Sequence, residues 1–208
     1  MTEHYFSRHP TAPSKPVEIE AMLRGRTFRF RTDRGVFSYR RLDEGTRLLI
    51  ETMEVGPQDT VLDHGCGYGA IGIVAATLAP RGFVWLVDAN ARAVELAQAN
   101  LGLNRIRNAR VRWGEDLEAV GGVVFDVILA NPPIRAGWAV ISAMIGQAHE
   151  RLGPAGRFYV VGRTDKGAKT LARRMGERFP HVGEVAKRAG YRVYAAMRNS
   201  AANVEKNV

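Results

Sequence analysis

Residues 61–73, VLDHGCGYGAIGI, decide the fold. An apolar run leads into Gly65, Gly67 and Gly69, and a second apolar run with helical spacing follows them. Glycine has no Cβ atom, so a glycine-rich turn between a strand and a helix lets backbone atoms approach a ligand closely. The stretch therefore predicts a strand, a cofactor-binding turn and a helix, in that order.

On either side of this turn, the chain alternates between strand and helix patterns. Apolar runs bounded by turn residues lie at 60–62, 83–87, 109–113, 124–130 and 157–161. Helical patterns separate most of them, and Val127-Ile128-Leu129 is a continuous apolar run, as a strand covered on both faces requires. This alternation predicts a doubly wound α/β domain with a mostly parallel sheet, ending in a basic helix and a last strand at 191–197.

The N-terminal part has a different pattern. Residues 1–22 contain prolines among polar residues, and we expect them to form a mobile or strapped lead-in. From Arg26, arginine and phenylalanine alternate up to a turn signal at 33–35, which predicts a β-hairpin with one aromatic face. We expect a single domain at 23–200 that includes this hairpin, followed by a disordered tail at 201–208.

Composition narrows the class of protein. Lys and Arg number 30 against 21 Asp and Glu, a net charge of +9, which fits either a polyanionic partner or charge dispersed for solubility. The single cysteine, Cys66, cannot form an internal disulfide, and the five histidines lack metal-ligand spacing, so we expect no metal. The chain shows neither a membrane span nor a signal peptide, and we expect a cytoplasmic protein.

An acidic residue completes the cofactor pattern. Asp88 ends the apolar run that follows the glycines, where a carboxylate can accept hydrogen bonds from both ribose hydroxyls. The spacing Gly65-x-Gly67-x-x-Ala70 also satisfies the dinucleotide fingerprint, so an NAD-dependent oxidoreductase stays open. Asp63, before the glycines, would repel a pyrophosphate but attract a cationic amino-acid ligand. We therefore favour S-adenosylmethionine, which carries a sulfonium and an ammonium group.

The tripeptide Asn131-Pro132-Pro133 ends the fourth apolar run, at the sheet edge where such folds bind ligands. The side-chain oxygen of Asn131 and the carbonyl of Pro132 can each accept one hydrogen of an NH2 group, which aims the nitrogen lone pair at a methyl donor. These contacts strengthen as the nitrogen becomes positive, which is electrostatic catalysis without a general base. The alternative is a simple strand stop.

An acidic pair follows the third apolar run, in Trp113-Gly114-Glu115-Asp116-Leu117. Asp116 is placed to accept the adenine amine of the cofactor. A solvated acidic loop is the alternative.

Several motifs carry a family resemblance. They are Gly35-Val36-Phe37-Ser38, Asp43-x-Gly45-Thr46, Leu62-Asp63-x-Gly65-Cys66-Gly67-x-Gly69, Phe125-Asp126, Asn131-Pro132-Pro133-Ile134-Arg135-x-Gly137, Lys166-Gly167-Ala168 and Gly190-Tyr191-Arg192-Val193. With them the chain resembles the small-domain class I methyltransferase family, typified by ribosomal small-subunit RNA guanine-N2 methyltransferases and a compact archaeal relative.

The resemblance implies a Rossmann-like, seven-stranded sheet with an antiparallel last hairpin, and S-adenosylmethionine as methyl donor. It implies that Asp63, Gly65 and Gly67 hold the methionine part of the donor, Asp88 the ribose and Asn131 the target amine. We also expect cofactor contacts from Cys66, Ala89, Asp116 and Asn131. Substrate contacts are expected from Phe37, Pro133, Ile134, Arg135, Lys166 and Tyr191.

The expected substrate is guanine N2 in ribosomal RNA. Ile134 stands where methyltransferases of adenine or glutamine commonly carry an aromatic ring, which disfavours adenine. Methylation of adenine N6, of protein glutamine or of a small amine stays open, as does a non-catalytic RNA-binding module. We expect a monomer or homodimer.

Two basic segments are candidate RNA surfaces, with a solvated face as the alternative for each. The first, at the predicted hairpin, combines Arg24, Arg26, Arg29, Arg31, Arg34, Arg40 and Arg41 with Phe28, Phe30, Phe37 and Tyr39. The second, the helix after the fifth apolar run, carries Lys166, Lys169, Arg173, Arg174 and Arg178. Phe28 and Phe30 are expected in the core.

Overall fold

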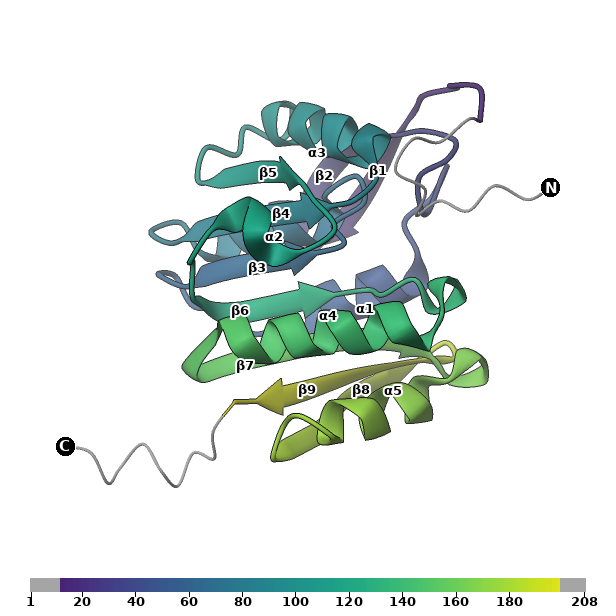
Figure 1. Cartoon of the computed structure of the whole chain (residues 1–208). Coiled ribbons are helices and arrows are strands. Elements are labelled where there is room, and N and C mark those ends of the chain that lie inside the picture. Colours follow the sequence, from purple (N-terminus) through teal and green to yellow (C-terminus); the bar gives the residue numbers. More distant parts are fainter. Residues whose placement is uncertain (1–11, 199–208) are drawn as a thin grey trace.

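A seven-stranded sheet in the order β5-β4-β3-β6-β7-β9-β8 forms the centre of the computed structural model, which describes residues 12–198 (Figure 1). Its strands are β3 (Thr60–His64), β4 (Phe83–Asp88), β5 (Ala109–Trp113), β6 (Phe125–Ala130), β7 (Leu152–Arg163), β8 (His181–Arg188) and β9 (Tyr191–Met197). Neighbouring strands from β5 to β7 are parallel, whereas β9 runs antiparallel to both β7 and β8. The predicted doubly wound sheet with an antiparallel last hairpin is confirmed.

Helices cover both faces of this sheet. The α-helices are α1 (Glu44–Thr52), α2 (Ala70–Leu78), α3 (Ala91–Leu103), α4 (Trp138–Arg151) and α5 (Ala168–Gly176), and the 3₁₀ helices are η1 (Leu117–Val120), η2 (Ile134–Ala136) and η3 (Thr164–Lys166). Buried residues of α1, α2 and α3 form one core, and those of α4 and α5 form a second. Along β6, Val127 and Leu129 belong to the first core and Ile128 to the second, as the two-residue period of a strand requires.

The predicted hairpin exists, but its strand pairing was wrong. Strand β2 (Arg26–Thr32) pairs with β1 (Val17–Leu23), which precedes it, and not with residues after the turn signal at 33–35. Arg24 and Gly25, both at positive φ (50° and 73°), make the connection. Two such residues give the tight turn that matches the twist of paired strands. Residues 17–22, expected in the lead-in, thus belong to a strand, while residues 1–11 and 199–208 lie outside the described residues.

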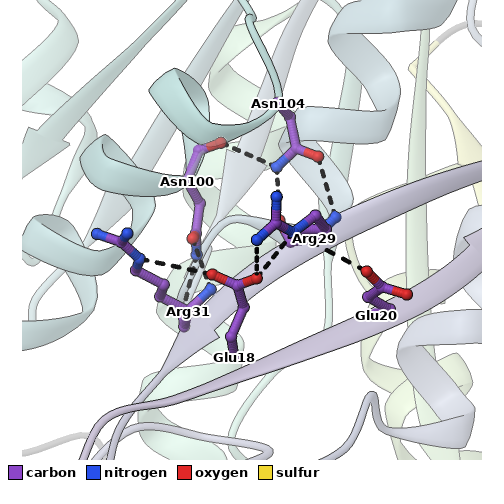
Figure 2. Close-up of polar contacts among 6 residues, drawn as sticks. All are labelled: Glu18, Glu20, Arg29, Arg31, Asn100 and Asn104. Atoms are coloured by element: carbon purple, nitrogen blue, oxygen red, sulfur yellow. Dashed lines mark hydrogen bonds and ion pairs between the residues drawn. The ribbon is translucent and has the colours of Figure 1, made fainter.

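Two asparagines of α3 hold the hairpin against the domain (Figure 2). Asn100 accepts a hydrogen bond from the backbone N–H of Arg31 and donates to its carbonyl, and Asn104 does the same with Arg29. Asn100 also donates to the carbonyl of Tyr68 in the glycine turn. The hairpin is therefore joined through one buried side chain to the turn that opens α2.

Candidate active site

A cavity of about 490 Å³ lies at the carboxyl ends of β3, β4 and β6, where the sheet was predicted to bind its ligand. Its volume suits a ligand of cofactor size. The predicted site residues that line it are Phe37, Gly65, Cys66, Gly67, Asp88, Ala89, Asn131 and Pro133. Residues from four separate segments, the loop before α1 and the turns that follow β3, β4 and β6, thus surround one space.

The backbone N–H groups of the glycine turn already donate hydrogen bonds to other atoms of the protein. The N–H groups of Gly65 and Cys66 both donate to the carbonyl of Val87, at 2.8 and 3.0 Å. The N–H of Gly67 donates to Oδ2 of Asp88 at 2.8 Å. A pyrophosphate site needs free amide donors, and here three are already engaged beside a carboxylate. The turn therefore suits a cationic ligand better than a dinucleotide.

Asp88 lies at the end of β4, where the sequence predicted a ribose contact, and it lines the cavity. Besides the bond from Gly67, its Oδ1 accepts from the N–H of Asn90 at 2.8 Å. Burial raises the pKa of this carboxyl group, against the lowering by these backbone hydrogen bonds. Each carboxylate oxygen has two lone pairs, so the side chain keeps capacity for two ribose hydroxyls.

Asp63 lies beneath the turn and is not among the residues that line the cavity. It is fully buried, and its Oδ2 accepts a hydrogen bond from the N–H of Gly72 in α2 at 2.8 Å. Within the described residues, Oδ1 has no hydrogen-bond partner. Burial, assisted by the neighbouring charge of Asp88, raises the pKa of Asp63 to about 7. A nearby cation would stabilise this buried carboxylate, which fits the ammonium or sulfonium group of the expected cofactor.

Glu115, and not Asp116, lines the cavity after β5. Oδ1 of Asp116 accepts from the N–H of Glu118 at 3.0 Å, so this side chain caps η1. The adenine contact of Asp116 stays a prediction, and Glu115 is the member of this acidic pair that lines the cavity. An aspartate three residues after a strand fits a helix cap as well as a ligand contact, and the sequence could not separate the two.

Asn131 directly follows β6, and its side-chain amide has a defined direction. Nδ2 donates to Oγ1 of Thr46 at 2.9 Å and to Oδ2 of Asp43 at 3.2 Å. A carboxylate can only accept hydrogen bonds, so the NH2 group must lie on this side. The side-chain oxygen of Asn131 is thereby left on the opposite side, as an acceptor next to the cavity that this residue lines.

The two prolines that follow are placed differently. Pro133 lines the cavity, and its carbonyl accepts from the N–H of Ala136 at 2.7 Å, which closes the turn into η2. Pro132 is buried and is not among the lining residues. Ile134 packs against the core of α4 and α5 instead of lining the cavity. The side chain of Arg135 lies outside what the structure describes.

The remaining predicted substrate residues lie apart from the cavity lining. Tyr191 does not line the cavity; its hydroxyl donates to Oδ1 of Asp43 at 2.8 Å. Lys166 is exposed at the end of η3. The contact between Asp43 and Asn131 joins residues 88 positions apart, and the sequence analysis did not predict it, although Asp43-x-Gly45-Thr46 is one of the motifs of the family resemblance.

Two residues to which the sequence analysis gave no role, His64 and Gln147, also line the cavity. Nε2 of His64 lies 2.9 Å from Oε1 of Gln147. Burial lowers the pKa of His64 to about 4, so the imidazole is neutral at pH 7. Because the oxygen of Gln147 accepts, Nε2 carries the proton and Nδ1 is an acceptor.

The predicted basic surfaces are partly neutralised. Arg29 and Arg31 form ion pairs with Glu18, and Arg29 also with Glu20 (Figure 2). Phe28 and Phe30 are buried, as expected. On α5, Arg173 pairs with Glu177, and Arg174 bonds to Ser142. Lys166, Lys169 and Arg178 are exposed and have no salt bridge within residues 12–198.

Within the described part of the chain, no three His, Cys, Asp or Glu side chains gather as a potential metal site. None of the helices there has the length and apolarity needed to span a membrane.

Residues 27–195 match the family model of the methyltransferase small domain. The chain belongs to this family. Membership confirms the predicted enzyme class, a methyltransferase, and S-adenosylmethionine as its methyl donor. It also removes the dinucleotide alternative, in agreement with the engaged amides of the glycine turn.

Two curated proteins are similar to this chain over different shares of their length. The uncharacterized protein YbxB of Bacillus subtilis is 36% identical over 198 residues, which cover 94% of this chain and 98% of that protein. The ribosomal RNA large subunit methyltransferase G of Shewanella denitrificans is 34% identical over 134 residues, or 61% of this chain and 35% of that enzyme. The chain thus matches about a third of the length of that ribosomal RNA methyltransferase.

Among solved structures, the 16S rRNA guanine-N2 methyltransferase RsmC of T. thermophilus, in complex with AdoMet and guanosine, has a TM-score of 0.80. It is 29% identical, and the match covers 91% of this chain and 52% of that chain.

Proposed function

We propose that this protein transfers a methyl group from S-adenosylmethionine to the exocyclic N2 amine of a guanine in ribosomal RNA. The fixed amide of Asn131 carries the proposal, because its side-chain oxygen is left as an acceptor beside a cavity of cofactor size. The similarity to an enzyme that binds AdoMet and guanosine supports the choice of guanine.

The residues around the glycine turn suit the methyl donor, S-adenosylmethionine. Gly65, Cys66 and Gly67 line the cavity with backbone whose N–H groups are already hydrogen-bonded, beside the carboxylate of Asp88, which suits a cationic amino acid. Asp88 would accept the ribose hydroxyls next to Ala89. When bound, S-adenosylmethionine supplies a methyl group attached to a positively charged sulfur.

The chain contributes the orientation of the amine. The side-chain oxygen of Asn131 accepts one N–H hydrogen, and we assign the second to the main-chain carbonyl of Pro132, which lies between two residues that line the cavity, Asn131 and Pro133. With both hydrogens held, the nitrogen lone pair points toward the methyl group. The nitrogen gains positive charge as the new bond forms, so both contacts strengthen in the transition state. The proton of the resulting cation is acidic and leaves to water.

RNA is the proposed partner. Exposed Lys166, Lys169 and Arg178 offer charge for phosphates without a competing carboxylate among the described residues. A guanine paired within a helix cannot reach the cavity, so the target is unpaired or flipped out. Ile134, which packs into the core after the prolines, provides no ring to stack on adenine.

The proposal is tested with total RNA from a strain that lacks the gene. Incubation with the purified protein and tritiated S-adenosylmethionine should label N2-methylguanosine in ribosomal RNA. Asn131→Ala should lower kcat by roughly 10²–10³-fold, as removal of one preorganised hydrogen bond does, while donor affinity persists. Asn104→Ala, which removes an asparagine remote from the cavity, is the control. Label in another nucleoside, or full turnover by Asn131→Ala, would contradict the proposal.

A further inference from the structure

Two motifs that contribute little to the cavity wall meet directly behind Asn131. They are Asp43-x-Gly45-Thr46, at the start of α1, and Gly190-Tyr191, at the start of β9. We propose that Asp43, Thr46 and Tyr191 are positioning residues, which lock the amide of Asn131 in the one orientation that accepts from a substrate amine. The inference rests on the proposed role of Asn131.

Asp43, Thr46, Tyr191 and Asn131 form a continuous chain of hydrogen bonds, which we call the lock. The hydroxyl of Tyr191 donates to Oδ1 of Asp43 at 2.8 Å. The other oxygen, Oδ2, accepts from the backbone N–H of Thr46 at 2.9 Å and from Nδ2 of Asn131 at 3.2 Å. Oγ1 of Thr46 accepts a second hydrogen bond from Nδ2 at 2.9 Å. Both hydrogens of the Asn131 amide are thus engaged away from the substrate.

The direction of each bond is fixed by chemistry. Burial and the hydrogen bond to Asp43 raise the pKa of Tyr191 to about 12, so its hydroxyl stays protonated and is the donor. The carboxylate of Asp43 has no hydrogen to donate. An amide rotated by 180° would place its oxygen against this carboxylate and would lose the hydrogen bond to Asp43, whereas the hydroxyl of Thr46 could turn and donate to the rotated oxygen. The rotated state is therefore disfavoured as long as Asp43 is present.

The lock matters because the two ends of an asparagine amide have nearly the same shape. If the amide turned over, NH2 would face the NH2 of the substrate, and donor would meet donor. A side chain free to rotate would spend part of its time in the wrong orientation and would hold the amine less accurately. Misplacement of a reacting group by about 1 Å can cost about 10²-fold in rate.

Gly45 explains how the two motifs come together. A Cβ atom at this position would lie 2.5 Å from Cδ1 of the Tyr191 ring and 2.9 Å from Oδ2 of Asp43. Only glycine lets the ring lie against the first turn of α1 while its hydroxyl reaches Asp43. Gly45→Ala should therefore displace Tyr191 and lower kcat, with donor affinity retained.

Asp43 also caps α1, so its role must be separated from helix stability. Serine is a comparable N-cap residue, but its side chain is too short to reach Asn131 and Tyr191. Asp43→Ser therefore keeps the cap and removes the lock. Asparagine at this position keeps both functions, because its oxygen replaces Oδ2 while its NH2 faces the hydroxyl of Tyr191, which can turn to accept.

The experiment compares Asp43→Ser, Asp43→Asn and Tyr191→Phe in the full-length protein. Tyr194→Phe, on the same strand but in the other core, is the control. We expect kcat to fall about 10- to 100-fold in Asp43→Ser and several-fold in Tyr191→Phe. Asp43→Asn and Tyr194→Phe should stay within about threefold of wild type, and donor affinity should not change in any variant.

A second readout does not depend on methyl transfer. The side-chain NH2 signals of Asn131 in a ¹⁵N correlation spectrum, identified by their loss in Asn131→Ala, should show slow hydrogen exchange. Asp43→Ser should accelerate this exchange at least tenfold. Unchanged exchange, or a kcat in Asp43→Ser equal to wild type, would overturn the lock. Full turnover by Asn131→Ala would instead refute the proposed function, whatever the exchange rates show.

Discussion

Replacing Asp63 with asparagine should change how the stability of the ligand-free protein depends on pH. Asp63 is fully buried, its Oδ1 has no partner among the described residues, and its pKa is raised from 3.8 to about 7. Burial is the main cause and the charge of Asp88 adds to it, so a large part of the shift reflects a charge enclosed by protein. Asparagine has nearly the same shape and no charge.

The sign and size follow from the two pKa values. Between pH 3.8 and about 7, the folded protein holds a proton on Asp63 that the unfolded chain has released, so stability falls as pH rises. About three pKa units correspond to roughly 4 kcal/mol, of which about 3 kcal/mol falls between pH 5 and pH 8. The wild-type protein should lose this amount relative to Asp63→Asn over that interval.

The assay is urea unfolding of both proteins at pH 5 and pH 8, without ligand. His64, whose pKa burial lowers to about 4, gives an opposite slope below its ordinary pKa, but it is present in both proteins and cancels in the comparison. The difference in unfolding free energy between variant and wild type should grow with pH. Parallel pH profiles for the two proteins would refute the buried-charge reasoning.

Two further predictions concern packing and RNA binding. Gly82→Ala should lower the unfolding free energy by at least about 1–3 kcal/mol, because the added Cβ would lie 2.1 Å from a backbone oxygen. Gly102→Ala in α3, where a Cβ meets nothing within 4 Å, should stabilise by about 0.5–1 kcal/mol, and equal melting temperatures would contradict both estimates. The RNA-binding prediction compares the double variant Lys169→Gln/Arg178→Gln with Arg29→Gln in a filter-binding assay. The double variant should lose more RNA affinity and more of its salt dependence, because the charge of Arg29 is already paired with Glu18 and Glu20. Equal losses would place the RNA on the hairpin.

Local patterns predicted most of the fold. Continuous apolar runs located five strands of the sheet, because burial on both faces leaves a direct trace in the sequence. The hairpin was misread because the turn signal at 33–35 stands beside the aromatic strand, whereas its true partner at 17–23 alternates charged and apolar residues without aromatic rings. A turn formed by Arg24 and Gly25 at positive φ is a weaker signal than Asp-x-Gly.

The sequence predicted those site residues that lie at the carboxyl ends of the parallel strands. Asp88 ends β4, and the glycine turn and Asn131 directly follow β3 and β6, so the parallel arrangement of these strands brings all three to one edge. Asp63 and Asp116 do not line the cavity, because their carboxylates accept hydrogen bonds from the backbone N–H groups of Gly72 and Glu118, and the sequence does not show which way such a side chain turns. The contact of Asn131 with Asp43 depends on tertiary packing, which no local pattern encodes.

The antiparallel direction of β9 has a consequence for the site. Tyr191 is the first residue of β9, and it pairs with Arg163, the last residue of the parallel strand β7. Because β9 runs backwards, its beginning lies at the edge where the parallel strands end. A parallel β9 would place Tyr191 at the opposite edge, a strand length away from Asp43 and Asn131. The reversed last hairpin therefore supplies a hydroxyl to the site from a strand that could not otherwise reach it, and this links the topology of the sheet to the orientation of one amide.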